Sequence, residues 1–197
     1  MAGLRSLDLI KTLIAFDTTS RESNLELIAF IQDYLSGFGV ESLLVHNEEG
    51  TKANLYATLG DKDKPGIMLS GHTDVVPVNP DGWSRDPFAG DLVDGEVWGR
   101  GAVDMLNLTA SQAVVMRALA DSGFRPRGDL IFFAVADEES GSLHGARWMA
   151  DNEADAIRAD YVLTENGGLH SGTEGAPVIS VNVAEKGASW RRLTVRG

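Results

Sequence analysis

Residues 130–139 read Leu-Ile-Phe-Phe-Ala-Val-Ala-Asp-Glu-Glu. A run of seven apolar residues that stops at three carboxylates predicts a buried strand with its acids at the edge of a sheet. Adjacent like charges repel each other unless a cation or a proton compensates them. This edge is therefore a candidate metal site, and the rest of the chain can be searched for further ligands.

Composition limits the classes of protein to which the chain can belong. It has 197 residues, 17 basic against 29 acidic side chains and a net charge of −12, which argues against a nucleic-acid surface. There are no cysteines, so any metal must be held by Asp, Glu and His. No apolar run approaches the ~20 residues needed to span a membrane. The N-terminal stretch is interrupted by charges and is no secretory signal, so a cytoplasmic location is the default expectation.

Hydrophobic periodicity predicts an α/β fold. Helices are expected over residues 6–16 with Ser6 as N-cap, over 23–36, from just after Asp104 to about 121, and over 143–152. Strands are expected over 41–46, 53–59, 67–70, 130–136, 161–163 and 178–183, with a hairpin of 91–93 and 96–98 around Asp94-Gly95. The third helix is expected to turn Leu108, Val114, Val115, Ala118 and Leu119 inward. Interleaved strands and helices indicate a mixed, mainly parallel sheet flanked by helices.

Side chains that can bind a metal follow three of the predicted strands. His72 and Asp74 follow the strand at 67–70, Glu138 and Glu139 follow 130–136, Glu165 follows 161–163, and Asp104 precedes a helix. Sites in open α/β sheets form outside the carboxyl ends of the strands, so these groups are expected to converge. One imidazole with several carboxylates suits zinc, manganese or cobalt in a hydrolytic site.

The spacing within each group has its own interpretation. Residues two apart on extended chain point the same way, so Asp74 can hold the second ring nitrogen of His72. Of the adjacent pair, one glutamate can bind metal while the other serves as general base. Each group alone also fits an ordinary surface charge or a helix cap. Their joint placement at three strand ends favours the site.

At these residues the chain resembles the dinuclear-zinc hydrolases, a family of carboxypeptidase G-type enzymes, aminoacylases, acetylornithine deacetylases and succinyl-diaminopimelate desuccinylases. The matching stretches are Ser70-Gly-His-Thr-Asp-Val-Val-Pro77, Trp98-Gly-Arg-Gly-Ala-Val-Asp-Met105, Asp137-Glu-Glu-Ser-Gly-Ser142 and Leu163-Thr-Glu-Asn-Gly-Gly168. The last of these is most similar to the peptidase-like branch.

The resemblance implies a role for each matched residue. His72 and Glu165 would bind one zinc, Asp104 would bridge both ions, and Glu139 would bind the second. Glu138 would be the general base that takes a proton from the water and passes it to the leaving amine. Asp74 would support His72. Two zinc ions are implied, with cobalt or manganese as alternatives, and so is a cis peptide bond between Asp104 and Met105.

The chain also departs from the family pattern. Leu106-Asn107 stand where the family has Lys-Gly. Family members are about twice as long and have an inserted lid or dimerisation domain. We therefore expect residues 1–184 to be the N-terminal part of the catalytic domain and 185–197 the beginning of the insertion. His46, His144 and His170 do not match the family's final zinc histidine, so the second ion lacks a ligand within this chain.

Two functions remain open. The first is a metal-dependent hydrolase that cleaves an amide bond of a peptide, as a dipeptidase or carboxypeptidase does, or of an N-acyl amino acid. The second is a fragment without catalytic competence that acts as a metal-binding or interaction module. The resemblance implies a small-molecule substrate and a homodimer formed through the inserted domain, with no nucleic-acid or membrane partner.

Overall fold

The computed structural model describes residues 5–61, 64–166, 168, 170–181, 183–184, 187, 189 and 191–196. Its contacts divide the chain into two units, residues 1–165 and residues 166–197. The domain boundary expected at residue 184 stays a prediction, because residues 185 and 186 lie outside the described ones. No helix in the described part of the chain is long and apolar enough to cross a membrane.

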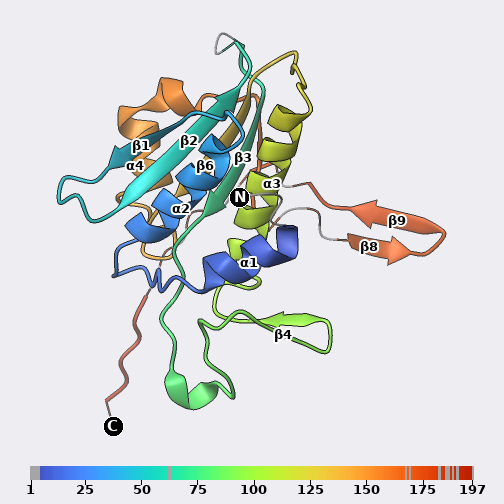
Figure 1. Ribbon diagram of the computed structural model, residues 1–197. Helices are drawn as coiled ribbons and strands as arrows, with labels where there is room; N and C mark the ends of the chain where they lie inside the picture. Colours follow the sequence, from blue (N-terminus) through green and yellow to red (C-terminus); the bar gives the residue numbers. More distant parts are fainter. Residues whose placement is uncertain are drawn as a thin grey trace. The chain divides into compact units, whose positions relative to one another are not determined.

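A five-stranded sheet organises the first unit (Figure 1). Its strands lie in the order β1 (Ser42–His46), β2 (Ala53–Leu59), β6 (Leu130–Val135), β3 (Ile67–His72) and β7 (Tyr161–Leu163). The β6–β3 and β3–β7 pairs are parallel, whereas β1–β2 and β2–β6 are antiparallel. The predicted mixed sheet with a parallel core is confirmed, and the apolar run at 130–136 is its central strand.

Helices cover both faces of this sheet, which explains why β6 is apolar at every position. Phe132 and Ala134 pack into the larger core with α1 (Ser6–Ile14), α2 (Leu25–Ser36) and α3 (Leu106–Asp121). Ile131, Phe133 and Val135 pack into a smaller core that includes Met149 of α4 (Ala146–Asn152). Successive side chains of a strand point to opposite faces, so a strand between two helical layers needs an apolar residue at every position.

Short elements complete the architecture. They are the 3-10 helices η1 (Pro80–Gly82) and η2 (Ala154–Ile157), the hairpin of β4 (Asp91–Val93) and β5 (Glu96–Trp98), and the hairpin of β8 (His170–Thr173) and β9 (Ala176–Ile179). The β4–β5 hairpin has the predicted bounds. The strand predicted over 178–183 has different bounds: β9 begins earlier, at Ala176, ends at Ile179 and pairs with β8, because the chain turns at Glu174-Gly175.

Two helix details differ from the sequence prediction. Ser6 is the first residue of α1, and the N-cap is Arg5, which makes no side-chain capping bond. Helix α3 buries Thr109, Ala110, Ala113 and Met116 among others, while Val115 and Ala118, both predicted to face inward, are exposed.

The buried face of α3 follows from its close approach to β3. A Cβ at Gly71 would lie only 2.4 Å from Thr109 Oγ1, so glycine is required at this crossing. Thr109 and Gln112 of α3 are the residues that a Cβ at Gly71 would meet, so the helix turns this polar pair toward the sheet. Apolarity alone does not reveal this choice of face.

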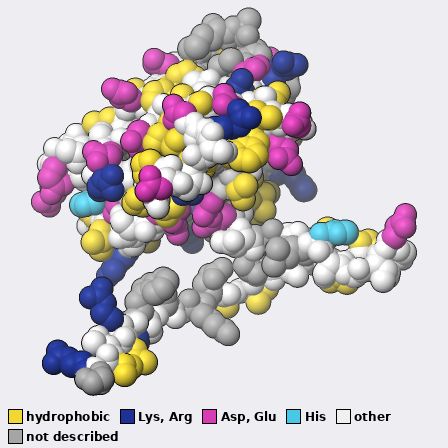
Figure 2. Space-filling view, turned by 90° about the horizontal axis from the view of Figure 1, so that it is seen from below, with side chains coloured by type: hydrophobic (Ala, Val, Ile, Leu, Met, Phe, Trp, Pro, Cys, Tyr) yellow, Lys and Arg dark blue, Asp and Glu magenta, His cyan; other side chains and the backbone are white. Residues whose placement is uncertain are grey.

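Charged side chains of both signs occur together on the face that the space-filling view shows. In the space-filling view, Lys and Arg side chains are scattered among acidic and hydrophobic ones (Figure 2). A protein that binds the phosphate backbone instead gathers its basic side chains into a patch or stripe. The expectation, drawn from the net charge, that nucleic acid is not a partner stays a prediction.

Candidate metal centre

The carboxyl ends of β6, β3 and β7 bring the predicted residues to one edge of the sheet. His72 is the last residue of β3 and pairs in register with Val135 near the end of β6. On its other edge β3 pairs with β7, where Leu69 is in register with Leu163, the last residue of β7. Parallel strands finish on the same side, so the residues that follow β6 and β7 meet His72.

The other five predicted site residues place their carboxylates around the His72 ring, and three of these carboxylates lie within 4.0 Å of its Nε2. Its Nε2 lies 3.0 Å from Asp104 Oδ1, 3.7 Å from Glu165 Oε2 and 4.0 Å from Glu138 Oε2. His72 is 2% exposed, whereas the Glu138 side chain is 43% exposed. A buried imidazole thus faces a set of carboxylates that solvent and small molecules can reach.

Two overlapping groups of these side chains have ligand atoms within 4.8 Å of one another. One is His72 with Asp104 and Glu139, and the other is His72 with Glu138 and Glu165. An imidazole with two carboxylates suits zinc, manganese or cobalt, so the donor set fits the predicted cations. The grouping differs from the expected one, since Glu138 lies beside Glu165 as a further oxygen donor.

The second ring nitrogen of His72 has a different partner from the one its spacing predicts. Nδ1 lies 2.8 Å from the main-chain oxygen of Asp74, while the carboxylate Oδ1 of Asp74 is 3.7 Å away. A carbonyl oxygen only accepts, so Nδ1 carries the proton in this contact and Nε2 is directed at the carboxylates. The tautomer suits metal binding through Nε2, and the main chain fixes it.

The Asp74 carboxylate instead supports the two adjacent glutamates. Its Oδ1 accepts the Glu138 N–H at 3.0 Å, its Oδ2 accepts the Glu139 N–H at 3.2 Å, and the Ser20 hydroxyl donates to Oδ2 at 2.6 Å. Asp74 is buried at 2% exposure, so these bonds are shielded from water. It therefore fixes the backbone from which Glu138 and Glu139 project.

Side chains of helix α3 support the strands that carry His72 and Glu165, and the sequence alone did not indicate this role for Thr109 or Gln112. Asp104 precedes this helix, and the expected cis bond between it and Met105 is present. Thr109 Oγ1 donates to the His72 carbonyl at 2.9 Å. Gln112 Nε2 donates to the carbonyl of Ser70 at 3.2 Å and to that of Leu163 at 3.4 Å. These bonds hold β3 and β7 together just before His72 and Glu165.

Burial and neighbouring charges raise the pKa of two carboxyl groups of the site, those of Glu139 and Glu165. Burial, with a hydrogen bond to Asp104 and the charges of Asp104 and Glu138, raises the pKa of Glu165 to about 7. Burial and the charge of Asp104 raise the pKa of Glu139 as well. Burial lowers the pKa of His72, but Asp74 and Asp104 outweigh it and raise that pKa overall. The raised pKa values mean that Glu139 and Glu165 hold protons more tightly than isolated glutamates do, as expected where a cation would otherwise compensate them.

Binding of a divalent cation is therefore expected to weaken as the pH falls below 7. Glu165 must lose its proton to bind a metal, and its pKa of about 7 makes protons competitors there. For one proton the affinity falls by about tenfold per pH unit below that pKa. Isothermal titration with Zn²⁺ from about pH 8 to about pH 6 measures the slope. Glu165→Gln should bind more weakly with a shallower slope, and an unchanged slope would exclude Glu165 as the titrating ligand.

Asp137 faces a different environment from its two neighbours. It is 5% exposed and has a left-handed backbone with φ of 64°. Burial alone would raise the pKa of its carboxyl group, but hydrogen bonds from Lys52 and Ser140 hold that pKa below its usual value. The three adjacent acids thus separate into one buried ion-pair partner and two site residues.

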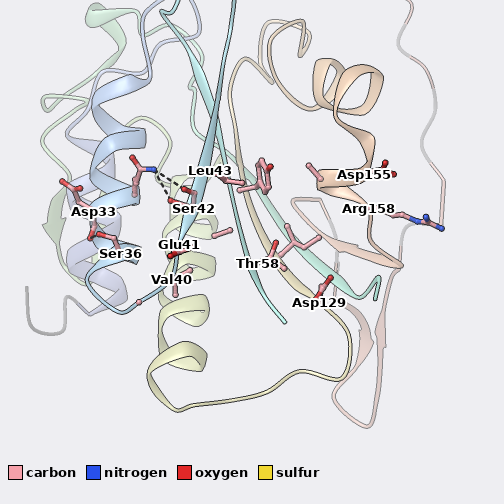
Figure 3. A pocket seen from close by; sticks show the side chains of 16 residues that line it. Asp33, Ser36, Val40, Glu41, Ser42, Leu43, Thr58, Asp129, Asp155 and Arg158 are labelled. Carbon is pink, nitrogen blue, oxygen red and sulfur yellow. Dashed lines mark hydrogen bonds between the residues drawn. The ribbon is translucent and has the colours of Figure 1, made fainter. Parts of the chain in front are cut away.

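A hollow of about 910 Å³ lies elsewhere on the molecule (Figure 3). It is lined by residues of α2, β1 and the segment around η2, together with Thr58, Asp129 and Ile131. Thr58 pairs with Ile131 at the beginning of β6, the opposite end from Glu138 and Glu139. None of the predicted site residues lines this hollow.

Comparison with known proteins gives consistent results. Succinyl-diaminopimelate desuccinylase of Rhodospirillum centenum is 38% identical over 128 residues, which are 61% of this chain and 33% of that protein. The enzyme of the same name from Parvibaculum lavamentivorans is 43% identical over 102 residues, 51% of this chain and 25% of that protein. The chain thus spans about a third or less of the length of these relatives.

Solved structures share the fold. Human carnosine dipeptidase 1 superposes with a TM-score of 0.69 at 23% identity, over 81% of this chain and 38% of that one. An M20 family metallo-carboxypeptidase from Sulfolobus solfataricus gives a TM-score of 0.70 at 22% identity, over 85% of this chain and 38% of that one. The profile of Peptidase family M20/M25/M40 matches residues 68–191, a segment that holds every predicted site residue. The chain belongs to Peptidase family M20/M25/M40.

Proposed function

We propose that this chain is the metal-binding part of a hydrolase that cleaves an amide bond in an N-acyl amino acid or a peptide. The observation that carries the proposal is the convergence of one buried imidazole and four carboxylates at the carboxyl ends of β3, β6 and β7 and the start of α3. Membership of Peptidase family M20/M25/M40 supports it.

His72, Asp104, Glu139 and Glu165 are the proposed metal ligands. Their nitrogen and oxygen donors suit zinc, with cobalt and manganese as alternatives. When bound, a divalent cation supplies Lewis-acid chemistry, because it lowers the pKa of water and polarises a carbonyl oxygen. Two ions are proposed, and the second requires a ligand beyond the residues matched here.

Glu138 is the proposed general base. Its carboxylate is partly exposed, while its main chain is anchored to the buried Asp74. It can therefore meet a substrate without losing its position. In amide hydrolysis it takes a proton from the attacking water and delivers it to the nitrogen of the leaving amine as the C–N bond breaks. The products are a carboxylic acid and an amine.

The choice of substrate is supported unequally. The desuccinylase of Rhodospirillum centenum, whose name describes removal of a succinyl group, is 38% identical over the matched residues. The dipeptidase and carboxypeptidase structures share the fold at 22–23% identity. These values support an N-acyl amino acid over a peptide, although Leu163–Gly168 resembles the peptidase-like branch.

The second candidate is a metal-binding or interaction module without catalysis. It is favoured by the lack of a match to the family's final zinc histidine among His46, His144 and His170. Homodimerisation through an inserted domain and location in the cytoplasm also stay proposals.

Metal content and hydrolysis measured together are expected to separate the two candidates. The native gene product, freed of metal and reloaded with Zn²⁺, should bind the ion and release amine from N-succinyl amino acids faster than from dipeptides. Mass spectrometry of the loaded protein gives the stoichiometry, and amine detection gives the rate. Tight binding with no release from either substrate class would favour the module. Failure to bind Zn²⁺, and Co²⁺ or Mn²⁺ in its place, would refute the hydrolase and leave only an interaction module that holds no metal.

A further inference from the structure

A buried ion pair adjoins the proposed site through Asp137, the residue before Glu138, and has no part in the chemistry above. Lys52, just before β2, places its Nζ 2.8 Å from Asp137 Oδ1, and the two side chains are 11% and 6% exposed. The same Nζ donates to the main-chain oxygen of Ser20. Desolvating two charges is costly, so removal of one partner strands the other in the interior.

The Asp137 carboxylate is held from three directions. Besides Lys52, it accepts a hydrogen bond from the Ser140 hydroxyl through Oδ1 and one from the His144 N–H, at 3.4 Å, through Oδ2. The segment 137–140 is thus tied to the interior through the residue immediately before Glu138. We call this segment the glutamate turn.

Ser20 links this tie to the one made by Asp74. Its carbonyl accepts from Lys52, and its hydroxyl donates to Asp74 Oδ2, which in turn accepts the Glu139 N–H. Two buried carboxylates therefore hold the glutamate turn by hydrogen bonds: Asp137, which belongs to the turn, and Asp74, which lies outside it. Lys52 bridges these two carboxylates, because its ammonium group pairs with Asp137 and donates to Ser20, whose hydroxyl bonds to Asp74.

We infer that Lys52 is a positioning residue: through Asp137 and Ser20 it fixes the glutamate turn so that Glu138 and Glu139 face His72. The inference rests on the proposed metal site. Lys52 also neutralises the charge of Asp137, which is the one acid among residues 137–139 that does not face the proposed metal. Of these three acids, only Glu138 and Glu139 then present a negative charge to the proposed metal.

Loss of the bridge should therefore weaken metal binding without removal of a ligand. Replacing a group that orients metal ligands typically costs about 10–100-fold in affinity. We expect a loss of that size in Lys52→Met, together with a changed visible spectrum of bound Co²⁺. Lys52→Arg keeps a cation that can reach Asp137 and should recover most of the affinity and the spectrum.

The test is a Co²⁺ titration of the metal-free chain, with affinity measured by competition against a chromophoric chelator. Lys11→Met, the same chemical change on α1, is the matched control and should bind as the unaltered chain does. If the unaltered chain does not bind Co²⁺, the proposed function fails. If it binds and Lys52→Met matches it in affinity and spectrum, this inference alone fails.

The double variant Lys52→Met/Asp137→Asn separates positioning from simple burial of an unpaired charge. It removes both charges and keeps one side-chain oxygen, which can accept from the Ser140 hydroxyl, so its circular-dichroism melt should lie closer to that of the unaltered chain than the melt of Lys52→Met does. We expect its Co²⁺ affinity to stay about tenfold reduced. Recovery of full affinity in the double variant would overturn the positioning role, even if Lys52→Met itself did not fold.

Discussion

Glu138→Gln is expected to lower turnover by roughly 10²–10⁴-fold, the usual contribution of a general base. The change keeps the size of the side chain and removes its capacity to take a proton at neutral pH. Because Asp74 holds this residue through the main-chain N–H, the turn should keep its conformation in the variant. Steady-state amine release by the native gene product, freed of metal and reloaded, measures the loss.

The metal content of the same variant decides how the loss is interpreted. We expect Glu138→Gln to keep its bound cation, since His72, Asp104, Glu139 and Glu165 remain. Glu153→Gln, a change at an exposed residue just after α4, is the matched control and should leave the rate unaltered. If Glu138→Gln lost metal in parallel with turnover, the residue would be a ligand, as its place beside His72 and Glu165 allows.

The sequence is sufficient to predict the framework and the convergence of the proposed site residues at one edge of the sheet. The apolar run at 130–136 and the acids that follow it indicate a central strand buried on both faces, and β6 is that strand. Parallel pairing of β3 with β6 and β7 then brings His72, Glu138 and Glu165 together. These features were predictable because periodicity and strand ends are local properties of the chain.

The contacts that hold the site were not predictable in the same way. Lys52 precedes a strand, where a lysine is ordinarily solvated, and only its three-dimensional neighbours reveal the buried pair with Asp137. The partner of His72 Nδ1 is a main-chain oxygen, which no side-chain pattern encodes. The buried face of α3 also includes Thr109 and Gln112, which lie over Gly71, and no apolar pattern encodes that contact.

The main-chain oxygen of Asp74 supports His72 while its carboxylate supports Glu138 and Glu139, and this difference has a physical cause. After β3 the Thr73 N–H and hydroxyl both donate to the Val135 carbonyl at 2.8 Å, which ties this stretch to the end of β6. The side chain of Asp74 then lies against the glutamate turn, whose N–H groups need acceptors. A buried N–H without a partner is costly, so the carboxylate is used there while a carbonyl suffices for the imidazole.

His72→Ala is expected to have the largest effect on metal binding of any single change. His72 belongs to both groups of side chains that can hold a metal, and its Nε2 lies within 4.0 Å of three carboxylates. Without it the site offers only crowded acids, and the pKa of Glu165, already about 7, loses the opposing charge of the imidazolium. The affinity for Zn²⁺ should fall by more than the roughly 100-fold that loss of an orienting group costs at most.

His46→Ala supplies the matched control, because His46 ends β1 on the exposed edge of the sheet and belongs to neither group of ligands. Isothermal titration of both variants at about pH 8, above the pKa of Glu165, keeps proton competition out of the comparison. His46→Ala should bind Zn²⁺ as the unaltered chain does. Comparable affinity in His72→Ala would mean that carboxylates alone hold the ion. The end of β3 would then lose its place as the centre of the site, and the proposed two-ion arrangement would have to be rebuilt around Asp104.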